Sequence, residues 1–175
     1  MKILFRGLLV ISSLLLVFLI AGMMLPEKIE IESTVIINTP VENLYVQLND
    51  YKTTTKWSGW ANKDKNVEYK YEGEATGVGA IMHWRSQFGT IGHGSQKIIE
   101  AEKNKTVKNI VAISGMPRAY TIFKIKNLDK GIELTWRFDM QLGYNIPARI
   151  KALSMKNEIK EHYSQSLQRL KITLE

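Results

Sequence analysis

The residue types that could carry acid–base or covalent chemistry are few in this sequence. There is no cysteine, which excludes thiolate nucleophiles, disulfides and cysteine metal sites. The three histidines, His83, His93 and His162, show no metal-ligand spacing such as H-E-x-x-H, and no G-x-S-x-G motif offers a nucleophilic serine. We therefore expect no metal, no cofactor and no catalytic residue, with solvated surface as the default position for each histidine.

Two large apolar side chains stand out in the polar stretch TKWSGWANKD, residues 55–64. Trp57 and Trp60 are three positions apart, so one helical turn would point them the same way. Tryptophan is costly to expose, which means that both need an apolar surface to face. Two interpretations stay open: they cover one end of a ligand cavity, or they plug the end of a core.

Alternation of polar and apolar residues predicts six consecutive strands that form an antiparallel meander with one dry face. The strand segments are NVEYKYEG, GAIMHWRS, GHGSQKIIEAE, KTVKNIVAIS, RAYTIFKIK and GIELTWRFDMQL. Alternation directs His83 outward, whereas His93, between two glycines, would approach the interior only if the strand start turned it inward.

The residues expected on the dry face have a consistent chemistry: aromatic rings, methionines, amides and a hydroxyl, with no carboxylate or histidine. Such a lining suits binding of an apolar molecule better than turnover, which needs a positioned acid or base. An ordinary core has the same composition and remains the alternative. The inward positions are Tyr69, Tyr71, Met82, Trp84, Gln96, Asn109, Thr121, Phe123, Trp136, Phe138 and Met140.

Further elements flank the six strands. Residues 28–38 predict a strand, and residues 39–50 predict a helix with Thr39 as N-cap and Pro40 at its first position. A long amphipathic helix begins near Asn145 and Pro147. One sheet face and one helix stripe must bury each other, which predicts an α+β domain. The helix stripe consists of Ala152, Met155, Ile159, Tyr163, Leu167, Leu170 and Leu174.

The N-terminal segment has the composition of a membrane anchor. Residues 7–25 are uncharged, follow Lys2 and Arg6, and stop at Pro26. The positive-inside rule then places the N-terminus in the cytoplasm. We expect an anchor over residues 1–26 in the cytoplasmic membrane and an extracytoplasmic domain over residues 27–175. A cleaved signal peptide, with IAG at 20–22 as its site, is the less favoured alternative because the apolar run continues beyond it.

Three segments carry a family resemblance: IINTPVENLYVQLNDYKTTTKWSGW, GEATGVGAIMHW and EHYSQSLQRLK. They resemble the polyketide cyclase/dehydrase and lipid-transport family of the START-like (SRPBCC) helix-grip superfamily, which includes membrane-anchored bacterial members. The resemblance covers residues 28–175 and implies a curved antiparallel sheet around a long C-terminal helix, with the tryptophan turn at a cavity rim. Gly59 departs from the family, which often has proline there, and Gln96 and Asn109 stand where it has apolar residues.

These observations predict a membrane-anchored domain that encloses a hydrophobic small molecule or lipid. Trp57, Trp60, Trp84 and Trp136 would supply apolar area, and the amides of Gln96 and Asn109 would orient the ligand. The net charge of +7 is dispersed, which argues against nucleic-acid binding.

Two other functions stay open. One is a cyclase- or dehydratase-type enzyme that uses a tyrosine or His93, and the other is a ligand-free envelope interaction module. A carboxylate or histidine inside a cavity would favour the enzyme, and a filled cavity would favour the module.

Overall fold

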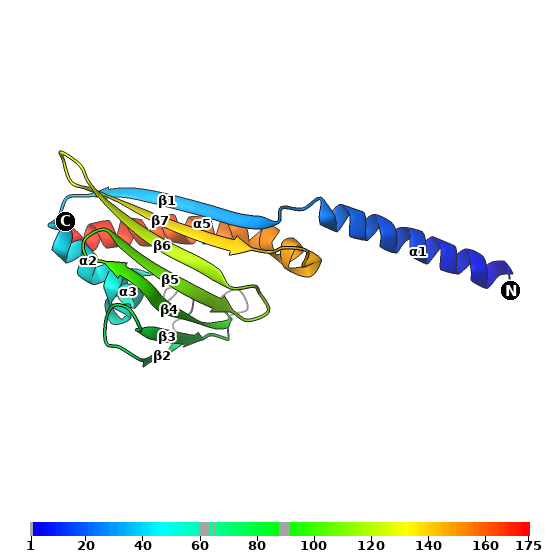
Figure 1. The fold of residues 1–175 in the computed structure, drawn as a ribbon, viewed down its shortest axis with the longest axis horizontal. Coiled ribbons are helices and arrows are strands. Elements are labelled where there is room, and N and C mark those ends of the chain that lie inside the picture. Colours follow the sequence, from blue (N-terminus) through cyan, green and yellow to red (C-terminus); the bar gives the residue numbers. More distant parts are fainter. Residues whose placement is uncertain (1, 60–63, 65, 88–91) are drawn as a thin grey trace.

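The computed structural model describes residues 2–59, 64, 66–87 and 92–175. Figure 1 shows a long helix, α5, lying along one face of a sheet, with a second long helix, α1, projecting beyond one end of the domain. The elements in chain order are α1 (Lys2–Met23), β1 (Lys28–Ile37), α2 (Val41–Asn49), α3 (Tyr51–Trp57), β2 (Glu68–Glu72), β3 (Ile81–Arg85), β4 (His93–Glu102), β5 (Thr106–Ile113), β6 (Ala119–Asn127), β7 (Ile132–Gln141) and α5 (Ile146–Leu174).

The seven strands form one antiparallel sheet in the order β1-β7-β6-β5-β4-β3-β2. Strands β2 to β7 are the predicted meander, and β1 pairs with β7 from Lys28 opposite Gln141 to Ile37 opposite Ile132. The order leaves β1 and β2 as the edge strands. This is an α+β fold of the helix-grip type, which confirms the predicted fold class.

Burial follows the predicted periodicities. Along β7, Ile132, Leu134, Trp136, Phe138 and Met140 are all buried, and the intervening residues are partly exposed. The buried stripe of α5 faces this row of side chains. It contains Ala152, Ile159, Tyr163, Leu167 and Leu170 as predicted, and Met155 and Leu174 are partly buried beside it.

The helix starts agree with the sequence signals in one case and not in another. Asn145 caps α5, since its Oδ1 accepts a hydrogen bond from the Ala148 N–H at 3.0 Å. The expectation of Thr39 as the cap of α2 is wrong. Pro40 occupies that position in an extended conformation without a side-chain hydrogen bond, and the helix begins at Val41.

Helix α1 contains a segment, Phe5–Met23, that is long and apolar enough to cross a membrane. Its described side chains are almost all uncovered by the rest of the protein, and the helix stands clear of the domain in Figure 1. The division into an anchor of residues 1–26 and a domain of residues 27–175 stays a prediction.

Candidate ligand-binding cavity

A cavity lies between the sheet and the first half of α5. Its volume is about 120 Å³. This volume leaves room for a chain or ring of several heavy atoms. The lining residues are Leu48, Tyr51, Thr54, Thr55, Ser58, Tyr69, Met82, Trp84, Gln96, Asn109, Val111, Ile113, Thr121, Phe123, Trp136, Phe138, Met155, Ile159 and Tyr163.

Strand alternation locates most of the sheet side of this cavity. The residues that were expected on the dry face and that line the cavity are Tyr69, Met82, Trp84, Gln96, Asn109, Thr121, Phe123, Trp136 and Phe138. They come from β2 to β7, so the whole meander contributes to one wall. Whether they contact a ligand stays a prediction.

Trp57 lies in the core and not on the cavity surface. It is 2% exposed, and its ring packs edge-on against Phe123 at 6.1 Å and Trp136 at 5.6 Å between ring centroids. Its Nε1 donates to the Gln47 carbonyl at 3.3 Å. Of the two interpretations of the tryptophan pair, the plug describes Trp57. Trp60 lies outside the described residues.

Two other expected lining residues also lie elsewhere. Met140 is buried near the end of β7, in the core and outside the cavity lining. Tyr71 shares a face with Tyr69 but is exposed, because β2 is an edge strand of the sheet among the described residues. The Tyr71 hydroxyl lies 3.2 Å from the Thr55 hydroxyl, at the rim.

The sequence reasoning missed two residues on the sheet side of the cavity and its helical side. Val111 and Ile113 could have been found, because they continue the alternation of Asn109 along β5. Met155, Ile159 and Tyr163 were assigned to the apolar stripe of α5 without being placed at a ligand site. Leu48 belongs to the helical spacing of residues 39–50 but was not placed at a ligand site. No periodic signal marked the residues of α3 and the turn after it, which are Tyr51, Thr54, Thr55 and Ser58.

A ladder of three polar side chains crosses the cavity wall. The Tyr51 hydroxyl donates to Asn109 Oδ1 at 2.8 Å, and Asn109 Nδ2 donates to the Thr121 hydroxyl oxygen at 3.1 Å. Burial raises the pKa of Tyr51 well above its usual range, so the hydroxyl stays neutral. The ladder explains how an amide can stand at position 109, where the family resemblance leads one to expect an apolar residue. A buried amide is tolerated when its polar atoms are paired.

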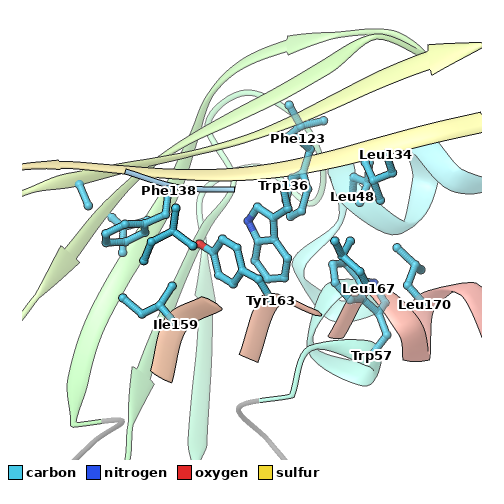
Figure 2. Close-up of a cluster of buried hydrophobic side chains, with 14 of the residues drawn as sticks. Leu48, Trp57, Phe123, Leu134, Trp136, Phe138, Ile159, Tyr163, Leu167 and Leu170 are labelled. Carbon is cyan, nitrogen blue, oxygen red and sulfur yellow. The ribbon is translucent and has the colours of Figure 1, made fainter. Parts of the chain in front are cut away.

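Trp136 and Tyr163 form the most closely stacked pair of rings in the site. Their centroids are 3.6 Å apart, with 10° between the planes. Nε1 of Trp136 is buried and has no hydrogen-bond partner among the described residues. Figure 2 shows this nitrogen on the same side of the stack as the Tyr163 hydroxyl. An unpaired buried donor costs about 1–3 kcal/mol, which a ligand acceptor would recover.

The histidines lie outside the cavity. His83 points outward as predicted, with Nε2 3.2 Å from Glu72 Oε2, and His93 is exposed opposite Arg85 at the start of β4. The surface expectation for His162 is wrong. It is buried on α5, with its ring edge-on to Trp136 at 6.2 Å.

His162 is buried because the turn after α3 covers this side of α5. The N–H of Gly59 donates to the Ser166 hydroxyl oxygen at 2.8 Å. A Cβ on Gly59 would collide with the guanidinium of Arg169 and come within 3.0 Å of His162 Nδ1. Proline has no N–H to donate to Ser166 and would add ring atoms in this narrow space. This explains why position 59 is glycine and not the proline that the family resemblance leads one to expect.

The described lining contains no histidine, carboxylate, lysine or arginine. Across the described part of the chain, no three His, Asp or Glu side chains gather closely enough to hold a metal ion. The tyrosines are the remaining titratable groups. Burial raises the pKa of Tyr163, with the negative charge of Asp139 adding to the effect, and it raises the pKa of Tyr69 to about 12. At neutral pH these hydroxyls can donate hydrogen bonds but are poor bases.

No family model matches the chain, and no curated protein matches its sequence. Solved structures do match its fold. The Aha1 dimer of Colwellia psychrerythraea is 20% identical, with a TM-score of 0.60 over 84% of this chain and 96% of that one. CalU16 of Micromonospora echinospora is 14% identical, with a TM-score of 0.53 over 83% of this chain and 73% of that one.

A third match is StfQ, a di-domain ARO/CYC protein from the steffimycin biosynthetic pathway. It is 10% identical, with a TM-score of 0.61, and covers 84% of this chain and 50% of that one. At these identities the likeness shows a shared fold, and function must be argued from the site itself.

Proposed function

We propose that the protein is a membrane-anchored binding domain that encloses a hydrophobic small molecule or lipid between its sheet and α5. The observation that carries the proposal is a mainly apolar cavity between the sheet and α5, with aromatic rings in its wall. The polar side chains that also line it carry no formal charge, and the three of the ladder already satisfy one another. A mainly apolar ligand would bury its surface there without competing for those groups.

The unpaired Nε1 of Trp136 supports a ligand that also carries one acceptor. A carbonyl, carboxyl or ether oxygen could accept from this donor, while the rest of the molecule contacts Phe138, Met155 and Ile159. The proposed ligand class is therefore an amphipathic molecule with an apolar chain or ring and an oxygen acceptor.

Substitution of Trp136 tests this ligand class. Trp136→Phe keeps a stacking ring and removes the N–H, so a fatty-acid analogue should bind about 5- to 10-fold more weakly, as expected for one hydrogen bond. A hydrocarbon of the same length should lose far less. Trp57→Phe is the matched control, because its Nε1 is already bonded to Gln47 in the core. If neither ligand binds the wild-type protein, the binding proposal is wrong.

An enzyme of the cyclase or dehydratase type is a second candidate, favoured by the fold shared with the ARO/CYC protein StfQ. In this chain such chemistry would depend on tyrosine hydroxyls that polarise a carbonyl, since the described lining has no carboxylate or histidine. His93 is exposed and lies outside the cavity lining, so the proposed catalytic chemistry would not use it. The interaction-module alternative is disfavoured by the presence of a cavity, since a filled interior was its expected sign.

We further propose that α1 holds the protein in the cytoplasmic membrane, with Lys2 and Arg6 inside and the domain outside. The length and apolar composition of α1 and the positive charges in its first turns support this topology. Alkaline phosphatase fused to the C-terminus should be active, and the protein should sediment with membranes. Activity of a cytoplasmic reporter alone, or release of a shortened protein, would contradict the anchored, outward topology.

A further inference from the structure

Arg149 is a charged side chain that is only 1% exposed, near the start of α5. Its Nε donates to the Gly143 carbonyl at 2.6 Å, and its Nη1 donates to the Met23 and Leu25 carbonyls at 2.9 Å each. Its Nη2 lies 3.2 Å from Glu27 Oε1. Carbonyls at the end of a helix lack intrahelical partners, and a cation there is favoured by the helix dipole. Arg149 thus joins the end of α1 to the start of α5.

Backbone contacts strengthen the same junction. A Cβ on Gly22 would lie 2.5 Å from Ile146 Cγ2, so glycine lets α1 approach the first residue of α5 closely. The N–H of Leu142 donates to the Glu27 carbonyl at 2.7 Å. Figure 1 shows α1 leaving the domain at this end, with α2 at the other end. A membrane that contains α1 therefore lies next to the start of α5.

Large apolar side chains are exposed at this end of α5. Tyr144 is 83%, Ile150 43% and Leu153 53% exposed. By contrast, every exposed residue of α5 between positions 154 and 171 is polar. The exposed apolar residues are thus concentrated in the part of α5 that adjoins α1, apart from Ile172 at the far end.

Two lysines accompany these residues. Lys151 and Lys156 are exposed, and neither forms an ion pair with any described residue. Tyrosine favours the interface between bilayer and water, and lysines near an anionic surface each add about 1 kcal/mol of attraction, or about fivefold. Ile150, Leu153 and Lys156 recur at steps of three and lie on one side of the helix, whereas Lys151 projects about 160° away from Leu153. We define the α1-proximal patch as Tyr144, Ile150, Leu153 and Lys156.

We propose that the α1-proximal patch rests on the surface of the bilayer that holds α1, with anionic phospholipid as its partner. The inference rests on the proposed anchoring by α1 but not on the proposed ligand. Met155 lies beside the patch on α5 and also lines the cavity, so docking would bring one cavity wall next to lipid.

Cysteine labelling of the full-length protein tests the proposal, because the chain has no native cysteine. Leu153→Cys, Ile11→Cys in α1 and Val46→Cys in α2 would each carry a nitrobenzoxadiazole fluorophore in vesicles containing phosphatidylglycerol. Doxyl-labelled lipid should quench the labels at positions 11 and 153 and leave position 46 bright. Quenching at 11 without quenching at 153 would overturn the docking proposal. Absence of quenching at 11 would overturn both the anchor and the docking that depends on it.

A charge variant separates lipid contact from self-association. Lys156→Gln should weaken docking about fivefold in phosphatidylglycerol vesicles and have little effect in phosphatidylcholine alone. A label at 153 that is shielded with rising protein concentration, but not quenched by lipid, would mean that a second copy covers the patch and would overturn the proposal. Titration of a fatty-acid analogue reports on the cavity independently of these outcomes.

Discussion

The two halves of α5 follow one apolar pattern but face different surroundings. In the C-terminal half, Leu167 and Leu170 are fully buried in a packed core that includes Trp57 and Leu134 (Figure 2). In the N-terminal half, Met155 and Ile159 line the cavity. The helix needs only one stripe at steps of three and four in both cases. The difference arises in what fills the space opposite that stripe, which depends on sheet curvature and on side chains from α2 and α3.

The largest expected difference between the packed end and the cavity end lies in their tryptophans. Trp57→Ala should lower the free energy of unfolding by about 3–5 kcal/mol, because the buried ring contacts Phe123 and Trp136. Trp84→Ala, in the partly exposed cavity wall, should cost about 1–2 kcal/mol. Urea denaturation of both variants measures the two values. Equal losses would mean that the two ends are packed alike.

Sequence reasoning predicted those parts of the molecule that depend on periodicity. Alternation located all six meander strands and most of the sheet wall, and the helical repeat gave the buried stripe of α5. It could not separate core from cavity, because Trp57, Met140 and Trp136 are equally apolar and differ only in whether another side chain fills the space beside them. Whether such a side chain fills the space depends on distances across the sheet, which the sequence pattern does not contain.

Other features depend on contacts between distant segments. Tyr51 pairs with Asn109 from 58 positions away, and Gly59 pairs with Ser166 from 107 positions away. His162 and Arg149 are polar residues in a helix, for which exposure is the usual expectation. Their burial follows from the turn after α3 and from the end of α1, and no local pattern in α5 indicates either contact.

Leucine and methionine substitutions on α5 test the difference between the two halves of the helix. Leu167→Ala should cost about 2–5 kcal/mol, because the packed core leaves a new cavity. Met155→Ala should cost about 1 kcal/mol, because it enlarges a space that already exists, and it should change the affinity for an apolar probe. Lys160→Ala, on the exposed face, should stay within about 0.5 kcal/mol. A Leu167→Ala variant as stable as Lys160→Ala would refute the assignment of the helix face.

A double-mutant cycle tests the polar ladder in the cavity wall. Tyr51→Phe should cost about 1–3 kcal/mol, because Asn109 Oδ1 loses the donor that it accepts from and stays buried. Asn109→Leu should cost a similar amount, because the buried Tyr51 hydroxyl then has no acceptor for its hydrogen bond. The double variant should cost less than the sum, since neither unpaired group remains. Strict additivity in urea denaturation would indicate that the two side chains do not interact.

At neutral pH the smallest expected effect on stability is that of Tyr69, whose ionisation reports how dry the cavity is. Burial raises its pKa to about 12, with the negative charges of ionised Tyr71 and Asp64 adding to the effect. Because the folded state keeps the proton longer than the unfolded chain, this tyrosine contributes nothing below pH of about 10 and reduces stability as the pH rises above it. The loss stops growing once the pH exceeds the folded pKa.

The ionisation of Tyr69 is measured by alkaline absorbance titration of the wild-type protein and of Tyr69→Phe. The difference between the two curves is the contribution of Tyr69. We expect a midpoint near 12 and a smaller loss of stability between pH of about 10 and 12 in the variant. A midpoint for Tyr69 near the ordinary tyrosine value of about 10 would mean that water reaches the Tyr69 hydroxyl freely. The cavity end would then differ from the packed end by being wet, and the case for an apolar ligand would lose the desolvated wall on which it depends.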